Sequence, residues 1–263
     1  MFICNLTGNE FHIDDREKHR EGGTVFDANS RIRALVYVLL KTVFKSDKTL
    51  NNIVPNKKIS GIGMSDSNNL ASKLSEKCHY INTFYHTYPF LDVHNDNHVS
   101  NYNNLDFIIS SDVFEHISPY PTIQSAFNNL FKMLKPGGTL IFSVPFIYDN
   151  YYEHFPSLYN YSIGFDEKVA KYYIKNVTID GEEELIYTYT TPCGKESDLC
   201  FHGGPGSTLE MRIFSYDALI QYLKIAGFKD ITFYDPHEEI DMQKHGIFWE
   251  NKCSFVLSAK KRE

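Results

Sequence analysis

The chain has 263 residues, of which 42% are hydrophobic and 22% are charged, and these values are typical of a folded globular protein rather than a disordered one. A formal net charge of -7, without a dense run of lysine and arginine, argues against a nucleic-acid partner. Five cysteines with no CxxC pair predict free thiols in a cytoplasmic protein without a metal site, and no apolar run is long enough to span a membrane.

Residues 1–50 are predicted to form an N-terminal extension that contains one helix. Residues 1–29 are polar and irregular. The run from Ser30 to Phe44 then places leucines on one face at helical spacing, with Ser30 as the N-cap. Its valines leave a strand open as an alternative, which the length of the run disfavours.

The remaining residues, 51–263, are predicted to form one α/β domain, because strands and helices alternate along them. Such alternation yields a mostly parallel sheet with helices on both faces. Leu105–Ser110 is a continuous apolar run, typical of a strand buried on both faces. The other expected strands are Lys58–Gly61, Tyr80–Tyr85, Pro89–Val93 and Thr139–Phe146, and the expected helices are Asn69–Lys77 and Pro121–Leu134, with Pro121 at the first helical position.

Residues 147–212 interrupt this alternation and are predicted to be an insertion that acts as a lid or as a wall of the substrate site. Within it, the short run Val177–Ile179, the turn Asp180-Gly181 and the alternating residues 184–190 predict a β-hairpin. The expected elements after the insertion are a helix from Ser215 to a stop at Gly227 and the strands Asp230–Tyr234 and Ser254–Ala259.

Three segments of the α/β domain carry a resemblance to a known family. They are ISGIGMSD after the first strand, DFIISSDVFEHI at the fourth and LFKMLKPGGTLIFSVPF before the fifth. In this order and spacing the sequence resembles the class I S-adenosylmethionine (SAM) methyltransferases, over roughly residues 58–146. The resemblance implies a Rossmann-like fold, SAM as cofactor and S-adenosylhomocysteine as product.

A second, narrower resemblance concerns the acceptor of the methyl group. The blocks NTFYHTYPFLDV, EHFP, FHGG and STLEMRIFS look like a subgroup of these enzymes associated with bacterial glycan and surface-polysaccharide synthesis. This similarity implies methyl transfer to an oxygen or nitrogen atom of a small molecule or glycan precursor.

The predicted cofactor residues follow the ends of the strands. Glycines between a strand and a helix allow a tight turn and close backbone approach to an anionic group, although a purely structural turn remains an alternative. The usual acid for the ribose is missing after the second strand, so ribose is either held by hydroxyl or amide groups or bound weakly. The resemblance assigns the cofactor to Gly61, Gly63, Ser65, Asp66, Thr83, Tyr85, Asp92 and Asp112, with Asp92 toward adenine and Asp112 toward methionine.

Methyl transfer is an in-line displacement, so a base is needed only where the acceptor loses a proton. The candidate bases are His116, His154 and His202, because a histidine titrates near neutrality. For His116 the alternative is that it begins or caps a helix. Glu153 and Arg212 are the candidates for acceptor binding, and for Arg212 the alternative is a strand with one polar face.

Two further functions compete with an active methyltransferase. The missing ribose acid and the altered glycine loop also suit a catalytically inactive binding or scaffold protein of the same fold. A nicotinamide-dependent enzyme is disfavoured, because the chain has neither a GxGxxG segment nor a downstream ribose acid. The oligomeric state is left open.

Overall fold

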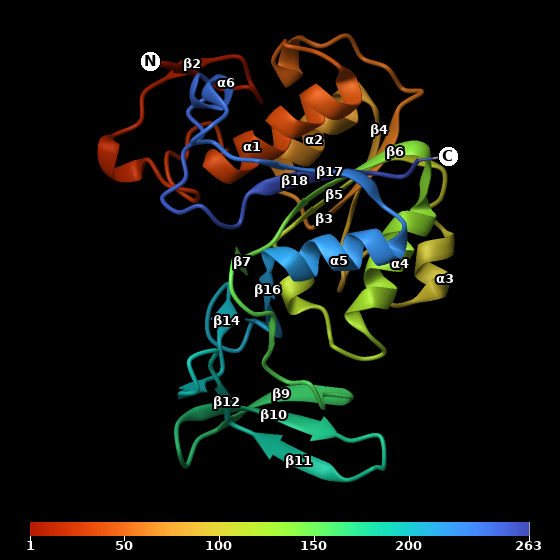
Figure 1. Ribbon diagram of the computed structural model, residues 1–263, viewed down its shortest axis with the longest axis vertical. Helices are drawn as coiled ribbons and strands as arrows, with labels where there is room; N and C mark the ends of the chain where they lie inside the picture. Colours follow the sequence, from red (N-terminus) through yellow and green to blue (C-terminus); the bar gives the residue numbers. More distant parts are fainter. Residues whose placement is uncertain (263) are drawn as a thin grey trace.

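The computed structural model describes residues 1–262 and builds them around a six-stranded sheet (Figure 1). The strand order is β17-β18-β6-β5-β3-β4; β3 to β6 run parallel, and β18 is antiparallel to both its neighbours. The predicted mostly parallel, Rossmann-like sheet is confirmed. Its strands are β3 (Ser60–Met64), β4 (His79–Thr83), β5 (Leu105–Ser111), β6 (Leu134–Ser143), β17 (Lys229–Tyr234) and β18 (Val256–Lys260).

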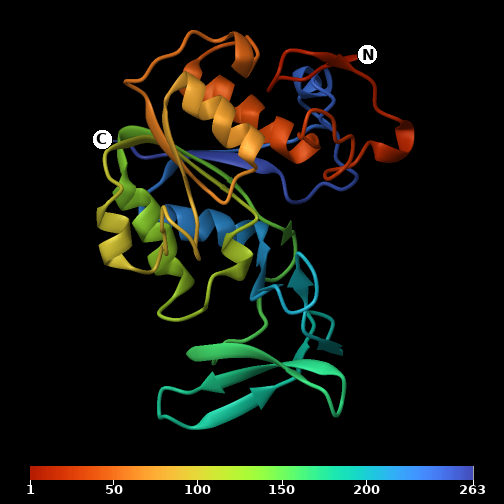
Figure 2. The ribbon, with the colours of Figure 1, turned by 180° about the vertical axis from the view of Figure 1, so that it is seen from behind.

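Helices cover both faces of the sheet, as Figures 1 and 2 show from opposite sides. One face carries α1 (Ser30–Leu39), which continues as the π-helical turn η2 (Leu40–Phe44), and α2 (Asn68–Lys77). The other carries α4 (Ile123–Met133) and α5 (Tyr216–Ala226), which pack against each other.

Two predicted helix starts are wrong by a residue or two. Asn29, not Ser30, caps α1, since its side chain accepts a hydrogen bond from the N–H of Ile32. Pro121 lies before α4 rather than inside it, because Thr122 is the N-cap of that helix. The predicted cap Ser215 and stop Gly227 of α5 are both confirmed, and Gly227 takes the left-handed conformation (φ 108°) typical of such stops.

The predicted third strand, Pro89–Val93, is wrong. Only an isolated bridge joins Phe84 to Phe90, so the sheet ends at β4. The backbone folds back on itself here: the N–H of Phe84 donates to the carbonyl of Pro89, and the N–H of Leu91 donates to the carbonyl of Phe84. Bonds made within the loop leave none for a neighbouring strand.

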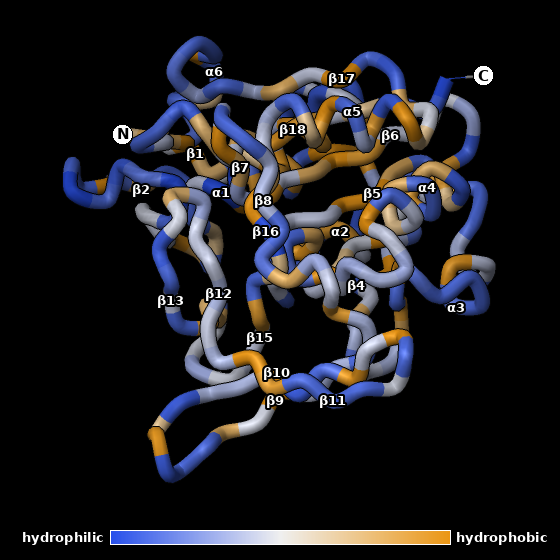
Figure 3. Tube along the Cα trace, turned by 60° about the horizontal axis from the view of Figure 1, so that its bottom comes forward, coloured by the Kyte–Doolittle hydropathy of each residue, from blue (hydrophilic) through white to orange (hydrophobic). Residues whose placement is uncertain are grey.

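The insertion forms a small sheet that projects from the domain (Figures 1 and 2). The predicted hairpin is present, but its turn is longer than expected: Val177 pairs with Glu183, so Ile179 lies in the loop. A small core of its own lies beneath this sheet. Figure 3 shows that the hairpin strands alternate between hydrophilic and hydrophobic residues, whereas hydrophobic residues gather in the central strands. The strands are β9 (Asn160–Asp166), β10 (Lys171–Val177) and β11 (Glu183–Ile186), and the core residues are Phe155, Leu158, Ile174, Leu209 and Met211.

The N-terminal segment belongs to the main core, in which Cys4, Leu6 and Phe11 are buried. None of the helices in residues 1–262 is long and apolar enough to cross a membrane. The remaining elements are β1 (Phe2–Ile3), β2 (Glu10–Phe11), η1 (Asp15–Glu17), η3 (Leu50–Asn52), α3 (Asp96–Ser100), η4 (Phe114–His116), β7 (Phe146–Ile147), β8 (Tyr152–Glu153), β12 (Thr188–Thr190), β13 (Glu196–Asp198), β14 (Phe201–His202), β15 (Thr208–Leu209), β16 (Arg212–Ser215) and α6 (Ile240–Gln243).

Candidate active site

The glycines expected in a turn between the first strand and a helix lie within β3, which continues to Met64, so that part of the prediction is wrong. A side chain at Gly61 would collide with the ring of Phe107, and one at Gly63 would collide with the carboxylate of Asp66. Ser65 then takes a left-handed conformation (φ 59°) and is exposed. The two glycines are therefore required by packing, and the bend at Ser65 turns the chain toward α2.

Asp66 faces the sheet instead of the open edge. Tyr80 donates a hydrogen bond to its carboxylate, and the side chain of Asn82 bonds both its N–H (3.0 Å) and its carbonyl (2.9 Å). Burial raises the pKa of Asp66 to about 6, although the bond from Tyr80 and the charge of Arg31 oppose this shift. The carboxylate of Asp66 thus fixes the loop from within.

Two hydroxyl groups lie at or just after the end of β4, and they differ in exposure. Thr83 is buried, and its hydroxyl donates to the carbonyl of Gly63 at 2.7 Å. Tyr85 is 64% exposed. Asp92 lies in the following loop, where its carboxylate accepts from the N–H of His94 at 2.9 Å. Of the two hydroxyls predicted to replace the ribose acid, only that of Tyr85 is on an exposed side chain.

Two arginines from the N-terminal segment occupy the edge beside Asp112. Nη2 of Arg20 lies 2.6 Å and Nε of Arg31 lies 3.2 Å from the Asp112 carboxylate. Glu21 pairs with both arginines, and Arg31 also donates to Ser111 at 2.7 Å. Burial would lower the pKa of Arg31, but the charges of Asp112 and Glu21 raise it overall. The edge thus brings two guanidinium groups and two carboxylates together.

The short helix η4 connects this edge to the insertion. Its Glu115 is fully buried, and neither carboxylate oxygen has a hydrogen-bond partner among the described residues. Burial, and next the negative charge of Asp112, raise the pKa of Glu115 well above its usual value. The carbonyl of Glu115 accepts from the N–H of Met211 at 2.7 Å, which ties η4 to the insertion.

Three histidines and one glutamate form a chain at this junction. Nε2 of His116 lies 3.1 Å from Nδ1 of His202, and Nε2 of His202 lies 3.2 Å from Glu210. The other oxygen of Glu210 lies 3.0 Å from Nε2 of His154. Burial opposes ionisation of Glu210, but the bonds from His154 and His202 outweigh it and lower the pKa of Glu210 to about 2. Burial lowers the pKa of His116, whereas the bond to Glu210 raises that of His202.

Arg212 lies at the base of this chain and is fully buried. Its Nε donates to Glu153 at 2.9 Å and its Nη1 donates to the carbonyl of Phe114 at 2.6 Å. Tyr151 completes the group by donating to the same Glu153 oxygen at 2.5 Å. The alternative of a solvated polar face for Arg212 is wrong, because this side chain joins β16 to η4 in the interior.

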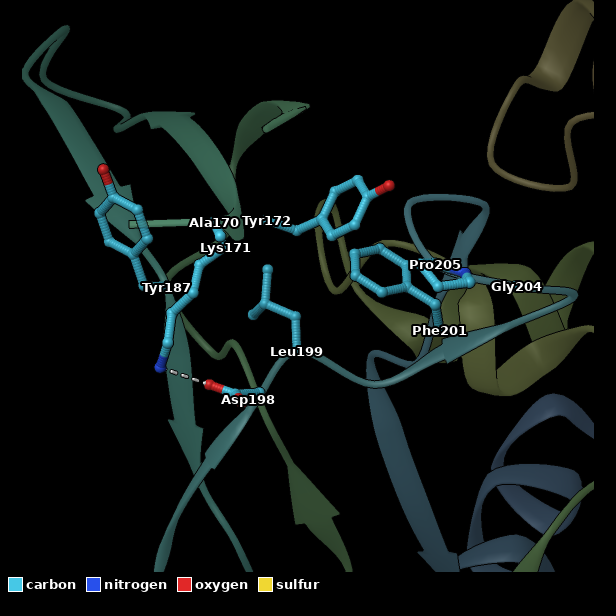
Figure 4. A pocket seen from close by; sticks show the side chains of 9 residues that line it. All are labelled: Ala170, Lys171, Tyr172, Tyr187, Asp198, Leu199, Phe201, Gly204 and Pro205. Atoms are coloured by element: carbon cyan, nitrogen blue, oxygen red, sulfur yellow. Dashed lines mark hydrogen bonds and ion pairs between the residues drawn. The ribbon is translucent and has the colours of Figure 1, made fainter. Parts of the chain in front are cut away.

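A hollow of about 350 Å³ opens in the insertion (Figure 4). Tyr172 and Phe201 stand against each other in its wall, with ring centroids 5.3 Å apart. Lys171 and Asp198 close one end with a 2.8 Å ion pair, and Tyr187 lines the same side (Figure 4). Because side chains alternate along a strand, Phe201 faces the hollow while His202 faces the histidine chain.

The structure thus collects the predicted residues into two neighbouring groups. Ser65, Tyr85, Asp92 and Asp112 follow the carboxyl ends of the strands, and the predicted histidines, Glu153 and Arg212 lie at the junction with the insertion. Sequence reasoning missed the residues that tie these groups together. They are Arg20, Glu21, Glu115 as a buried acid, and Glu210, and no local sequence pattern singled them out.

A model of the methyltransferase-domain family matches residues 31–176, more than half of the chain. The chain belongs to this family. No curated protein matches the methyltransferase closely enough to count as a relative. Family membership makes the protein a methyltransferase.

Several solved structures are similar to this methyltransferase at low identity. A SAM-dependent methyltransferase from Clostridium acetobutylicum is 15% identical, with a TM-score of 0.46 over 90% of this chain and 94% of that one. The 1,6-didemethyltoxoflavin-N1-methyltransferase of Burkholderia thailandensis is 13% identical, with a TM-score of 0.45 over 88% and 78%. The amino pentose methyltransferase CalS10 of Micromonospora echinaspora is 10% identical, with a TM-score of 0.40 over 77% and 83%.

The edge near Asp112 fits the methionine end of SAM, which carries one carboxylate and one ammonium group. The cluster offers guanidinium groups for the first and carboxylates for the second. Nε of Arg20 is buried and has no partner among the described residues, so a hydrogen-bond donor remains unused at this edge. Residues of the correct charge for the cofactor are therefore present.

Proposed function

We propose that this methyltransferase transfers the methyl group of SAM to a hydroxyl group of a saccharide precursor, of the kind used in surface-polysaccharide synthesis. The observation that carries the proposal is the partly buried chain of histidines and Glu210 that joins the cofactor edge to the insertion. A hydroxyl must lose its proton to become a strong nucleophile, and such a chain can accept that proton.

At the cofactor edge, Arg20 and Arg31 hold the methionine carboxylate, while Asp112 holds its ammonium group. Ser65 lies in the turn next to them, and Asp92 and Tyr85 lie further along the edge, toward the nucleoside. When bound, SAM supplies an electrophilic methyl group on a sulfonium centre. The residues of the protein orient that methyl group and exclude water.

At the acceptor side, one of His116, His154 and His202 takes the hydroxyl proton. The Glu210 carboxylate contacts two of these rings and stabilises the imidazolium that forms. Glu153 and Arg212 bind each other, and Arg212 is fully buried, so we propose that they position this group rather than contact the acceptor.

The insertion, residues 147–212, is the acceptor wall in this proposal. The aromatic rings around the hollow suit the apolar faces of sugar rings, and the Lys171–Asp198 pair at its end suits hydroxyl groups (Figure 4). Phe201 faces the hollow and the next residue, His202, faces the opposite side of β14, so in this proposal an acceptor bound in the hollow has to extend past β14 to reach the histidines.

Calorimetric titration with SAM and a methyl-transfer assay over a panel of sugars and nucleotide sugars test the proposal. We expect binding of SAM, and formation of S-adenosylhomocysteine with at least one saccharide. Asp112→Asn should weaken SAM binding at least tenfold, whereas Asp96→Asn, at an exposed position, should not change it. SAM binding without turnover on any acceptor would instead favour an inactive binding protein, which the missing ribose acid motivates.

A further inference from the structure

The hydrogen bonds around His116 and His202 determine where their protons lie. Nδ1 of His116 contacts the carbonyl of Leu209 at 2.8 Å, and a carbonyl can only accept, so this nitrogen carries the proton. Nε2 of His202 faces a carboxylate oxygen of Glu210, so it carries the proton of that ring. In neutral rings the two remaining nitrogens, 3.1 Å apart, therefore both present lone pairs to each other.

Two lone pairs at this distance repel unless a cation lies between or beside them. The adjacent Glu115 has the complementary need, because it is fully buried and both its oxygens lack a partner among the described residues. One of these oxygens lies 3.7 Å from Nε2 of His116. A buried carboxylate without a partner is costly, and a bound cation would stabilise it.

We propose that Glu115, His116 and His202 bind a divalent transition-metal ion of the zinc type. Two bonds of about 2.1 Å at a tetrahedral angle place the ligand nitrogens about 3.4 Å apart. The two nitrogens here are 3.1 Å apart, which is close to that separation. The rings stand perpendicular to each other, with an interplanar angle of 89°. Ligand histidines usually donate their other N–H to a carbonyl or carboxylate, and Leu209 and Glu210 provide these partners.

A second set of possible ligands, Cys200, His202 and Glu210, lies beside the first. It fits less well, because both oxygens of Glu210 already contact histidines. Glu115 has no such bonds. The sequence showed no metal site because the ligands come from η4 and from β14, and 86 residues separate the two histidines.

A metal ion bound here would change which histidine takes the proton of the acceptor, and this conclusion rests on the proposed function. With His116 and His202 as ligands, His154 is the remaining ring on Glu210 that can take a proton, and its Nδ1 is buried without a partner among the described residues. Three protein ligands leave coordination positions open, and oxygen atoms of the acceptor can occupy them.

Titration of chelator-treated protein with Co²⁺, followed by visible absorption, tests the site without reference to activity. We expect one equivalent of Co²⁺ per chain to produce visible bands, and Zn²⁺ to displace it. Glu115→Gln, which keeps the shape of the side chain, and His202→Ala should each abolish the bands. His79→Ala, at an exposed position where β4 begins, should keep them.

Further variants separate the possible ligand sets. Glu210→Gln should weaken Zn²⁺ binding roughly 10–100-fold, as expected for a residue that supports a ligand. Cys200→Ser should leave the Co²⁺ spectrum unchanged. Loss of the Co²⁺ bands in this variant would overturn the proposed ligands in favour of the set that contains Cys200. Circular dichroism of each variant confirms that it is folded. If His202→Ala is not folded, the isosteric Glu115→Gln decides the question.

The failure of this inference can be told apart from that of the proposed function. Absence of Co²⁺ and Zn²⁺ binding, with methyl transfer intact in chelator-treated protein, overturns the metal site and leaves the protonated histidine pair. Metal binding with the expected variant pattern, but no transfer to any saccharide, supports the metal site and overturns the proposed acceptor.

Discussion

The central sheet and the insertion both contribute charged groups to the candidate site, but they satisfy them differently. At the sheet edge, Asp112 contacts Arg20 and Arg31, and Glu21 neutralises the remaining charge. At the junction with the insertion, buried polar atoms without partners accumulate among the described residues. They are both oxygens of Glu115, Oε1 of Glu153, Nδ1 of His154 and Nη2 of Arg212.

The sheet is also packed more extensively than the insertion. The sheet lies in one large core that also includes the N-terminal segment, whereas the insertion has a separate core of five buried residues. The larger core thus belongs to the sheet. Among the described residues, five buried polar atoms without partners lie at the junction, whereas the sheet edge has Nε of Arg20 and Oγ of Ser110. Buried polar groups without partners are rare in folded proteins and often mark functional sites.

Removing the guanidinium that joins the two regions should have the largest effect. Arg212→Ala removes a fully buried guanidinium and leaves the partly buried Glu153 with only the hydroxyl of Tyr151. The loss of one member of a buried ion pair typically costs about 3–5 kcal/mol. Urea denaturation measures this change in the free energy of unfolding. Arg262→Ala, which breaks a pair with Asp230 on exposed side chains, is the matched control and should leave that free energy within experimental error. Equal effects of both changes would contradict the structural role of Arg212.

The second prediction tests whether the insertion unfolds independently. Ile174→Ala in the small core should cost about 2–5 kcal/mol locally, because a cavity opens among few neighbours. Hydrogen exchange should then speed up in residues 147–212 and stay slow in β5. Ile109→Ala in the large core is the control, and it should lower protection throughout the chain. Faster exchange in both regions after Ile174→Ala would show that the two cores unfold as one.

The sequence predicts the sheet better than the junction, and the two regions show why. A strand such as Leu105–Ser111 is recognised from its own apolar residues, since all of Phe107, Ile108 and Ile109 are buried. The insertion was recognised as an interruption, and its hairpin from a turn signal. The strand expected at Pro89–Val93 failed because bonds within the loop replaced those to a neighbour.

The site itself depends on contacts between distant residues, which local patterns do not contain. His116, His154 and His202 were selected singly, and only the fold brings them onto Glu210. Arg20 lies 92 residues before Asp112 in a segment without regular structure, so no periodicity pointed to their ion pair. The ion pair that fills the edge of the sheet is therefore a finding of the structure.

The third prediction concerns pH and the sheet side of the site. The folded state raises the pKa of Asp66 from 3.8 to about 6, so the protonated form is favoured on folding. This contribution to stability is complete below pH 3.8 and is lost as the pH rises through 6; the loss is about 3 kcal/mol at neutral pH. Asp66→Asn removes the titration and should be more stable than the parent protein at pH 7.5, with little difference at pH near 3.8. Urea denaturation at several pH values measures the gap, and a constant gap would contradict the shifted pKa.

The smallest changes in the free energy of unfolding should come from alanine substitutions at two glycines, one in the sheet and one in the insertion. At Gly61 an added methyl group meets the ring of Phe107 in the large core, so Gly61→Ala should cost about 1–3 kcal/mol through overpacking. At Gly181, in the hairpin loop of the insertion, nothing lies within 4 Å, but the backbone is left-handed (φ 84°). Gly181→Ala should therefore cost only about 1 kcal/mol, from backbone strain. Because the strain is confined to the hairpin, hydrogen exchange should change there and not in β3, whereas Gly61→Ala should change both β3 and β5. A larger cost at Gly181 than at Gly61 would mean that the hairpin is packed against another part of the enzyme.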